Sequence, residues 1–334
     1  MRLILVIFVA ALCLTGCKKE PPPPGAPDKP EPVTPVSPQD TECKAIPPPP
    51  AGFYWRDSTG DVFKDINAFF HNPLNGDEVI VIVNGNLQGS NQMMAVNLVS
   101  KSTRFLANLD QYLPSVNSAG WILFSTVDDH VYRIKANGDS LTQLTQLSGT
   151  HDPKWDFTGK HFYYLQDQFS TFESRLYRAS SSGVNVNSWL QDLPWSAPFH
   201  KSNKIVVQAR SGNVVTLYLA DNTSSLREAL VEGPFDSQKN QSHFRYLFVD
   251  SHDENMFWSN DEGIFRYNFS AKRTDTLFRN CETVIYDRPM QGKQNEITLS
   301  KHIIRVTHPY YLVHEYKAVE YNYVLKEERT VKVF

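Results

Sequence analysis

The densest groups of polar, potentially reactive side chains lie in two short segments, Asp128–His130 and Asp250–Glu254. Their carboxylates could offer oxygen ligands to a cation such as Ca²⁺. Neither segment has the ligand spacing and glycine of a known calcium loop, so solvated turns between strands are the simpler interpretation. The sequence also contains no G-x-S-x-G and no H-E-x-x-H motif, which mark serine hydrolases and zinc proteases. We therefore expect no catalytic residue, no metal site and no cofactor.

The first residues of the chain have the pattern of an export signal. Arg2 precedes an apolar stretch from Leu3 to Leu14, and the charged residues Lys18–Glu20 follow soon after it. A helix that spans a bilayer needs about 20 apolar residues, so this stretch is too short to remain as an anchor. Residues 1–16 are therefore predicted to be a cleaved signal peptide.

The end of this segment, Leu14-Thr15-Gly16-Cys17, resembles the lipobox of bacterial lipoproteins. The resemblance implies that Cys17 is acylated on sulfur, becomes the first residue after cleavage, and is often acylated on its amine. Several acyl chains give a stable membrane anchor, whereas one chain binds only marginally. Lys18, rather than Asp, follows the cysteine, which by analogy with enterobacterial sorting favours the outer membrane, periplasmic or surface-facing. The alternative is an ordinary secreted protein in which Cys17 is incidental.

Proline dominates the segment that follows. Of the 21 prolines in the chain, 13 lie between Lys18 and Pro50. Proline lacks an N–H donor and fixes φ, so this segment should be an extended spacer of about 3.1 Å per residue, roughly 100 Å at most. We expect residues 17–50 to be a lipidated, disordered linker that separates a folded domain from the membrane. A proline-rich ligand for a recognition domain is the alternative.

Cysteine and charge content restrict the function further. Besides Cys17, the mature chain keeps only Cys43 and Cys281, and export would place them in an oxidising compartment. The sequence cannot show whether the two approach within bonding distance, so a disulfide and two free thiols both stay open. Removal of residues 1–16 leaves 32 basic against 36 acidic residues, a net charge of −4. No basic run is present, so we expect no nucleic-acid partner.

Residues 51–334 have an all-β pattern that repeats. Pro114–Gly120 leads into the apolar Trp121–Phe124, and 39 residues later Pro153–Gly159 leads into Lys160–Tyr164. Each unit continues into an aromatic strand and a turn, for which Asn137-Gly138 is well suited because both positions tolerate φ > 0. The repeated unit therefore reads strand, turn, strand, strand, turn, strand.

These units resemble the repeat of TolB-like β-propellers, in which P-x-W-S-P-D-G-K precedes an apolar strand and then an aromatic strand. Residues 114–183 carry the match best, and weaker copies occur at 78–97, 198–221 and 255–267. Five positions recur at intervals of 37, 45, 41 and 47 residues, namely Ala95, Tyr132, Tyr177, Tyr218 and Phe265. These intervals are close to the length of a four-stranded propeller blade.

The repeat predicts an all-β fold, a six-bladed β-propeller of four-stranded antiparallel blades over residues 51–334. Five blades account for the chain to about residue 280. Residues 281–334 supply strands for a sixth, which an N-terminal hairpin at Phe53–Phe63 could complete. A two-sheet sandwich or an open β array is the alternative.

The resemblance implies a monomeric, non-catalytic module of the cell envelope whose channel binds another envelope protein or a peptide. The alternative is an envelope enzyme or carbohydrate-binding protein with an acid pair at the channel mouth. Aromatic residues that could stack on sugars are Tyr310, Tyr311, Tyr316, Tyr321 and Tyr323. Strand residues are commonly aromatic, so packing between blades is the favoured explanation and needs no ligand. Convergence of acidic and histidine side chains at the channel mouth would favour catalysis.

Overall fold

The computed structural model describes the folded part of the chain with a few gaps. The described residues are 43–47, 56–57, 66–84, 91–110, 113–168, 173–191, 195–221, 227–239, 241–307 and 311–333. They belong to one compact unit, residues 37–334. Cys17, the expected signal peptide and most of the proline-rich segment lie outside them. No helix long and apolar enough to cross a membrane occurs within these ranges.

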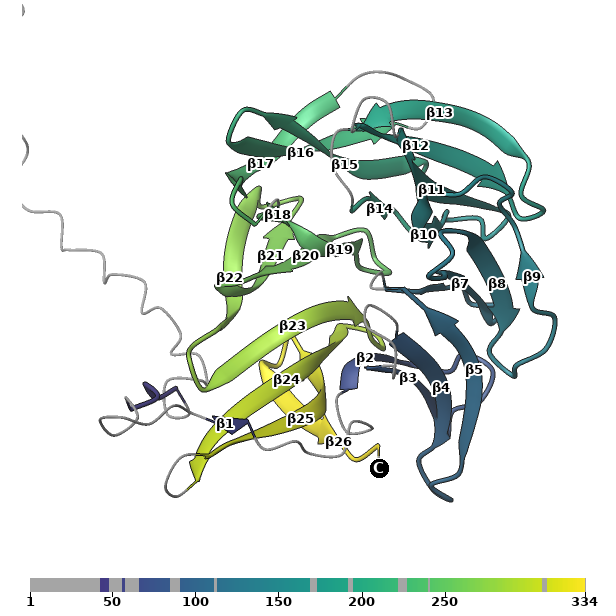
Figure 1. Ribbon diagram of the computed structural model, residues 1–334. Coiled ribbons are helices and arrows are strands. Elements are labelled where there is room, and N and C mark those ends of the chain that lie inside the picture. The colour runs from purple at the N-terminus through teal and green to yellow at the C-terminus, as the bar shows by residue number, and fades with distance from the viewer. Residues whose placement is uncertain are drawn as a thin grey trace, which may run out of the picture. The chain divides into compact units, whose positions relative to one another are not determined.

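The strands form six sheets that surround a common centre as the blades of a propeller (Figure 1). Blade 1 contains β2 (Ile66–His71), β3 (Glu78–Asn84), β4 (Asn91–Asn97) and β5 (Thr103–Leu109), and blade 2 contains β6 (Ser115–Val116), β7 (Trp121–Ser125), β8 (Val131–Lys135) and β9 (Thr142–Gln143). Blade 3 contains β10 (Thr150–Trp155), β11 (His161–Gln168), β12 (Glu173–Ser180) and β13 (Asn185–Gln191). The predicted six-bladed propeller is confirmed.

The second half of the chain forms the other three blades. Blade 4 contains β14 (Ala197–Pro198), β15 (Lys204–Ser211), β16 (Val214–Asp221) and β17 (Arg227–Asp236), to which β18 (Gln241–Ser242) adds a fifth strand. Blade 5 contains β19 (Arg245–Val249), β20 (Asn255–Asn260), β21 (Gly263–Asn268) and β22 (Arg273–Arg279), and blade 6 contains β23 (Val284–Gln291), β24 (Glu296–Thr307), β25 (Tyr311–Asn322) and β26 (Glu327–Val331).

Burial along the strands explains why the sequence shows apolar runs. The second strand of each blade has neighbouring blades against both faces, so all six residues of β20 are buried. The outer strand β22 is mostly exposed. The apolar clusters accordingly lie between blades; one of them joins Trp258 of blade 5 to Val206 of blade 4. Stability of the ring therefore depends on contacts between sheets.

Strand register confirms the repeat that the sequence shows. Tyr132, Tyr177, Tyr218 and Phe265 all pair with the fourth residue of the preceding strand. In three blades this pair is a stack of aromatic rings, with centroids 6.0, 5.4 and 5.6 Å apart. Ala95 is displaced by one position, because it pairs with Ile80, the third residue of β3.

The structure corrects the expected composition of blade 6. Its four antiparallel strands, β23 to β26, all come from the C-terminal part of the chain. Of the expected hairpin Phe53–Phe63, only β1 (Arg56–Asp57) is described, and it pairs in parallel with the first two residues of β25. Because β25 is twelve residues long, its edge accommodates β1 at one end and β26 at the other. The blade is thus complete without an N-terminal strand.

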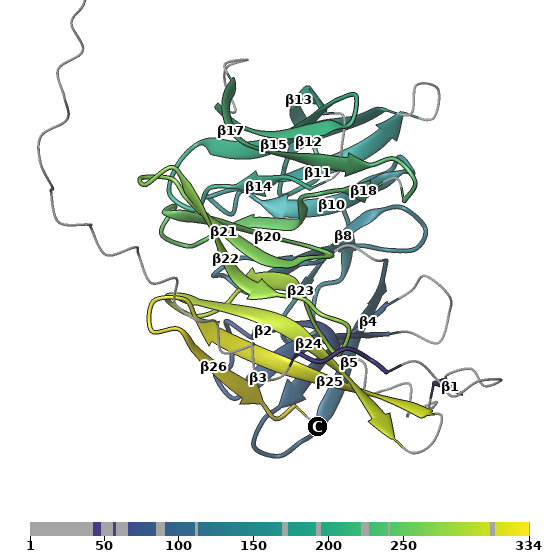
Figure 2. The ribbon, with the colours of Figure 1, turned by 90° about the vertical axis from the view of Figure 1, so that its left-hand side faces the viewer.

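Side chains therefore close the ring where blades 1 and 6 meet. Figure 2 shows strands of blade 6, in yellow, beside β2 and β3. The Thr298 hydroxyl donates to the Phe69 carbonyl oxygen at 2.5 Å. His71 Nε2 lies 2.7 Å from Glu320 Oε1. Ala318 adds an apolar contact to the same cluster as Phe69. No strand pairing across this junction is present among the described residues, so packing and hydrogen bonds hold it.

Candidate functional site

The innermost strands of the six blades enclose a cavity at the centre of the ring. Its volume is about 100 Å³. All six inner strands, β2, β6, β10, β14, β19 and β23, contribute to its wall, which is largely apolar and aromatic. The principal lining residues are Phe70, Pro114, Lys154, Trp155, Pro198, Tyr246, Phe248, Pro289 and Met290. A concave, mostly apolar site with few polar groups is the usual form of a ligand pocket.

Three of the inner strands share one irregularity at the same register. Two residues face a single residue of the next strand, a β-bulge, in β10, β19 and β23. The first residue of each bulge has a left-handed backbone, with φ of 48°, 53° and 52° at Asp152, Tyr246 and Arg288. Such backbone is uncommon outside glycine, and bulges redirect the side chains that follow them. The same bulge therefore recurs at the same level of the channel in three of the six blades.

In blade 3 the bulge brings a buried ion pair to the cavity. Lys154 Nζ lies 3.0 Å from Asp152 Oδ1, and the Asp152 side chain is completely buried. The Ser196 backbone N–H also donates to Asp152, at 3.4 Å. A buried carboxylate without a partner would be strongly destabilising, so Lys154 compensates it. Lys154 is at the same time part of the cavity wall.

An aromatic wall is contributed by blades 4 and 5. The rings of Trp195 and Tyr246 are 4.6 Å apart, and the Arg288 guanidinium lies 5.5 Å from the Tyr246 ring. Burial raises the pKa of Tyr246, so its hydroxyl stays neutral. Arginine over an aromatic ring is an attractive cation–π contact. This side of the channel is therefore a packed aromatic wall in which the Tyr246 hydroxyl is neutral.

The two polar segments singled out in the sequence are turns, and none of their residues lines the cavity, although Asp253 accepts a hydrogen bond from the backbone N–H of the lining residue His200 at 2.5 Å. Asp250 is buried and accepts hydrogen bonds from Asn255 at 2.7 Å and from the Tyr323 hydroxyl at 3.1 Å. Burial, with Asp250 nearby, raises the pKa of Tyr323. Asp128 accepts from the Thr126 hydroxyl in its own turn. Among the residues that the structure describes, no three His, Cys, Asp or Glu side chains gather where they could hold a metal ion.

Few titratable side chains line the cavity. Lys154 and His200 are the basic residues on its described wall, and no Asp or Glu is among the lining residues. His200 Nε2 lies 2.9 Å from the Val249 carbonyl oxygen. The acid pair that a catalytic channel mouth would need is thus not among these lining residues.

The C-terminal tyrosines have structural surroundings. Tyr321 packs against Phe278 and Tyr323 against Phe257, with ring centroids 4.5 and 5.2 Å apart, both between blades 5 and 6. Tyr316 stacks on His302 at 4.3 Å. The side chains of Tyr310 and Tyr311 lie outside the described residues. Packing between blades therefore explains Tyr321 and Tyr323.

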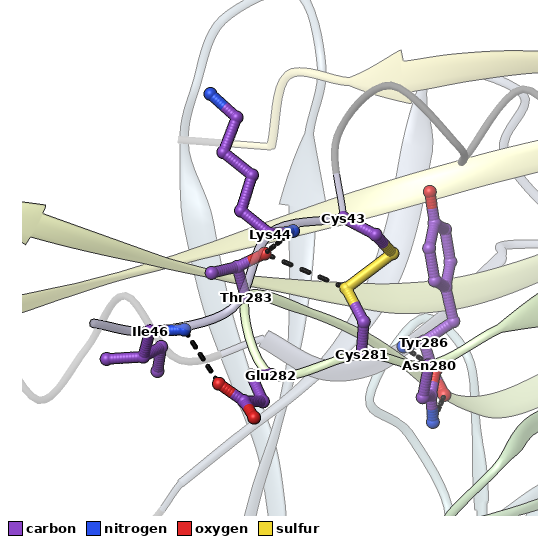
Figure 3. Close-up of a disulfide and its surroundings, with 8 residues drawn as sticks. All are labelled: Cys43, Lys44, Ile46, Asn280, Cys281, Glu282, Thr283 and Tyr286. Atoms are coloured by element: carbon purple, nitrogen blue, oxygen red, sulfur yellow. Dashed lines mark hydrogen bonds between the residues drawn. A yellow bond between two sulfur atoms is a disulfide. The ribbon is translucent and has the colours of Figure 1, made fainter. Parts of the chain in front are cut away.

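Figure 3 shows a disulfide between Cys43 and Cys281. Their Cα atoms are 5.8 Å apart, within the usual range for a disulfide. Next to it, the Lys44 backbone N–H donates to the Thr283 hydroxyl at 3.0 Å, and that of Ile46 donates to Glu282 at 2.7 Å. The bond fastens residues 43–47 to the connection between β22 and β23, where blade 5 leads into blade 6.

The channel residues were not predicted from the sequence. Lys154 lies between Pro153 and Trp155, in the unit that keeps the tryptophan of the TolB-like repeat, but the sequence does not show that its side chain faces the channel. Register also shows that Pro198 is equivalent to Trp155, since each pairs with the second residue of the next strand. The proline of the fourth repeat therefore does not correspond to Pro153.

Comparisons with known proteins place the fold. No protein-family model matches the sequence, and no curated protein matches it. A putative TolB from Agrobacterium tumefaciens is similar in structure, with 11% identity, 73% of this chain and 88% of that chain covered, and a TM-score of 0.54. The propeller domain of the trilobed protease from Pyrococcus furiosus has 11% identity, coverages of 81% and 98%, and a TM-score of 0.49.

Acylaminoacyl peptidase from Pyrococcus horikoshii has 10% identity and a TM-score of 0.49, and the match covers 84% of this chain but 54% of the peptidase. At such identities a structural likeness shows the fold alone. On the match to the Agrobacterium tumefaciens protein, the chain shares the β-propeller fold of TolB.

Proposed function

We propose that this chain is a lipid-anchored, non-catalytic binding module of the bacterial cell envelope, whose propeller takes up a segment of another protein at its central channel. The observation that carries the proposal is the apolar cavity to which all six inner strands contribute. A site of this kind gives binding energy through burial of apolar surface.

The proposed anchor is the lipid on Cys17, which would hold the protein in the outer membrane. The proline-rich residues 18–50 would form the stalk. The disulfide at Cys43 supports this arrangement, because it attaches the end of the stalk to the ring at a defined place. Several acyl chains would make the attachment stable.

The alternative function is an envelope enzyme or a carbohydrate-binding protein that uses the channel mouth. It would need a pair of acids, or exposed aromatic faces, at the cavity. The described wall offers Trp155, which is buried and donates its indole N–H to the Trp121 carbonyl oxygen at 3.0 Å. The apolar wall therefore supports binding of a polypeptide better than either alternative.

Site-specific photocrosslinking in intact cells tests the proposal. We would place p-benzoylphenylalanine at Phe248, on the cavity wall, and at Phe105, an exposed residue of β5 on the outside of blade 1, as the matched control. The expected result is a discrete crosslinked protein with the Phe248 variant and none with the Phe105 variant. Crosslinks at Phe105 alone, or none at either position, would count against uptake at the channel.

A further inference from the structure

We propose that Lys154 determines what the channel accepts: an uncharged, apolar stretch of polypeptide that places one aliphatic side chain in the cavity and a backbone carbonyl oxygen on Lys154 Nζ. The inference rests on the proposed function, because it names the chemistry of the segment that the channel would take up. It follows from hydrogen-bonding capacity, charge and size.

Hydrogen-bonding capacity singles out Lys154 on the described wall. An ammonium group has three N–H donors. Lys154 Nζ lies 3.0 Å from Asp152 Oδ1 as an ion pair, and its hydrogen bond to the Leu113 carbonyl oxygen, at 3.5 Å, is long. Three other polar side chains of the wall already have a partner: Ser115 accepts from the Trp155 backbone at 3.1 Å, Gln291 accepts from the Ser251 backbone at 3.1 Å, and His200 Nε2 lies 2.9 Å from the Val249 carbonyl oxygen. Lys154 therefore has a strong donor to offer to an occupant.

Charge decides which acceptor fits. Asp152 is completely buried and already neutralises Lys154, so the pair carries no net charge. A carboxylate on the occupant would add an uncompensated negative charge close to Asp152 in an apolar surrounding, which is unfavourable. A backbone carbonyl oxygen accepts the same hydrogen bond and brings no charge. The pair thus selects a neutral acceptor.

Size restricts the side chain that enters. The cavity measures about 100 Å³, whereas an engineered apolar cavity of about 150 Å³ binds benzene. A cavity of this volume has room for about one side chain, and its largely apolar wall favours an aliphatic one. Its contacts would be Phe70, Phe248 and Met290, which give an apolar wall on several sides. Leucine, isoleucine or valine in an otherwise uncharged segment matches this space.

Two small probes test the inference on residues 17–334 with Cys17→Ser, produced without residues 1–16, so that every other residue of the mature chain is kept. N-acetyl-leucine N-methylamide is neutral, and N-acetyl-leucine carries a carboxylate at the same place. Binding is measured from the NMR shift of the Trp155 indole N–H, assigned with Trp155→Phe. We expect the neutral probe to bind about tenfold more tightly. Equal binding of the two probes, or no shift at Trp155 with either, overturns the proposal.

Substitutions of the ion pair give a sharper result. Asp152→Asn leaves the charge of Lys154 uncompensated, so the preference should reverse toward the carboxylate probe; asparagine also tolerates the left-handed backbone of this position. Asp152→Asn with Lys154→Met removes both charges and the donor, so the neutral probe should bind about tenfold more weakly and the preference should disappear. Lys160→Met, in the exposed turn after β10, is the matched control and should behave as the parent.

The outcomes separate this inference from the proposed function. An unchanged preference in Asp152→Asn, or unchanged binding of the neutral probe in the double variant, shows that Lys154 does not select the occupant. Crosslinking at Phe248 would then still support uptake of another protein at the channel. If neither the small probes nor the photocrosslinking detected binding, the channel would not be a binding site.

Discussion

One buried carboxylate, Glu320, connects the two ends of the ring. Its side chain is 3% exposed, His71 Nε2 lies 2.7 Å away in blade 1, and Arg329 of β26 pairs with its other oxygen. Burial alone would raise the pKa of Glu320, but the hydrogen bonds from His71 and Arg329 hold it below the usual glutamate range. The ionised form is thus the one that the folded ring stabilises.

Glu320→Gln should lower the free energy of unfolding by about 3 kcal/mol at pH 7, because it breaks a buried ionic contact. Urea unfolding monitored by tryptophan fluorescence measures the change. The matched control is Glu315→Gln on the same strand, where a more exposed carboxylate pairs with Arg305 at 3.0 Å. Surface pairs contribute at most about 1 kcal/mol. Equal losses in the two variants would contradict the role given to Glu320.

The same contact predicts a dependence on pH. A carboxyl whose pKa is depressed on folding contributes stability above its unfolded-state pKa of about 4.3, and this contribution is lost as the pH falls through the lower folded-state value. The difference between the parent and Glu320→Gln should therefore narrow below about pH 4. A difference that persists undiminished at pH 3 would show that the lost stability does not come from the ionised group.

At the scale of the elements, the disulfide fastens the connection between β22 and β23 to the segment before blade 1. We expect the bond in the exported protein, where it would contribute about 2 to 4 kcal/mol by restricting the unfolded chain. Thiol labelling under denaturing, non-reducing conditions should leave Cys43 and Cys281 unlabelled. Cys281→Ser should then unfold at lower urea concentration than the parent. Two reactive thiols would refute the bond.

Much of the element order could be predicted, because the signals are local. Pro114 and Pro153 begin equivalent units, and Gly120 and Gly159 occupy turns with φ of 76° and 63°, as their spacing in the sequence suggests. Tyr132 and its counterparts in later blades gave the correct register because each blade repeats the same pairing.

The site could not be predicted from the sequence, because it depends on contacts between strands that are far apart in the chain. The bulges at Asp152, Tyr246 and Arg288 occur at the same position in their blades, but the three residues are of different types. No sequence motif therefore predicts them. The stacked pair His302 and His314, with ring centroids 5.0 Å apart, arises from the register of two long strands. Residues 281–334 supply strands of blade 6 as predicted, but the N-terminal hairpin is not needed to complete it, because this segment alone forms four strands whose boundaries are not visible in the sequence.

At the scale of the whole molecule, the main prediction is attachment to the membrane through lipid on Cys17. Cys17→Ser should abolish labelling with radioactive palmitate and leave the precursor uncut by lipoprotein signal peptidase, because the acylated sulfur is what that enzyme recognises in lipoproteins. Fractionation should find the parent with the outer membrane. Cys43→Ser is the control and should be labelled normally. Labelling of Cys17→Ser at the parental level would end the lipoprotein proposal.

The position of the disulfide also sets the path of mechanical load. If the chain is anchored at Cys17, a pull along the stalk reaches the covalent bond at Cys281 before it reaches β1 or β2. Tension then enters between blades 5 and 6 and bypasses the short parallel pairing of β1. Reduction of the bond would transfer the load to β1 and lengthen the tether by the 13 residues from Cys43 to Arg56, about 45 Å when extended. In an anchored chain, the thiol state of this cysteine pair would thus set how far from the membrane the propeller can reach.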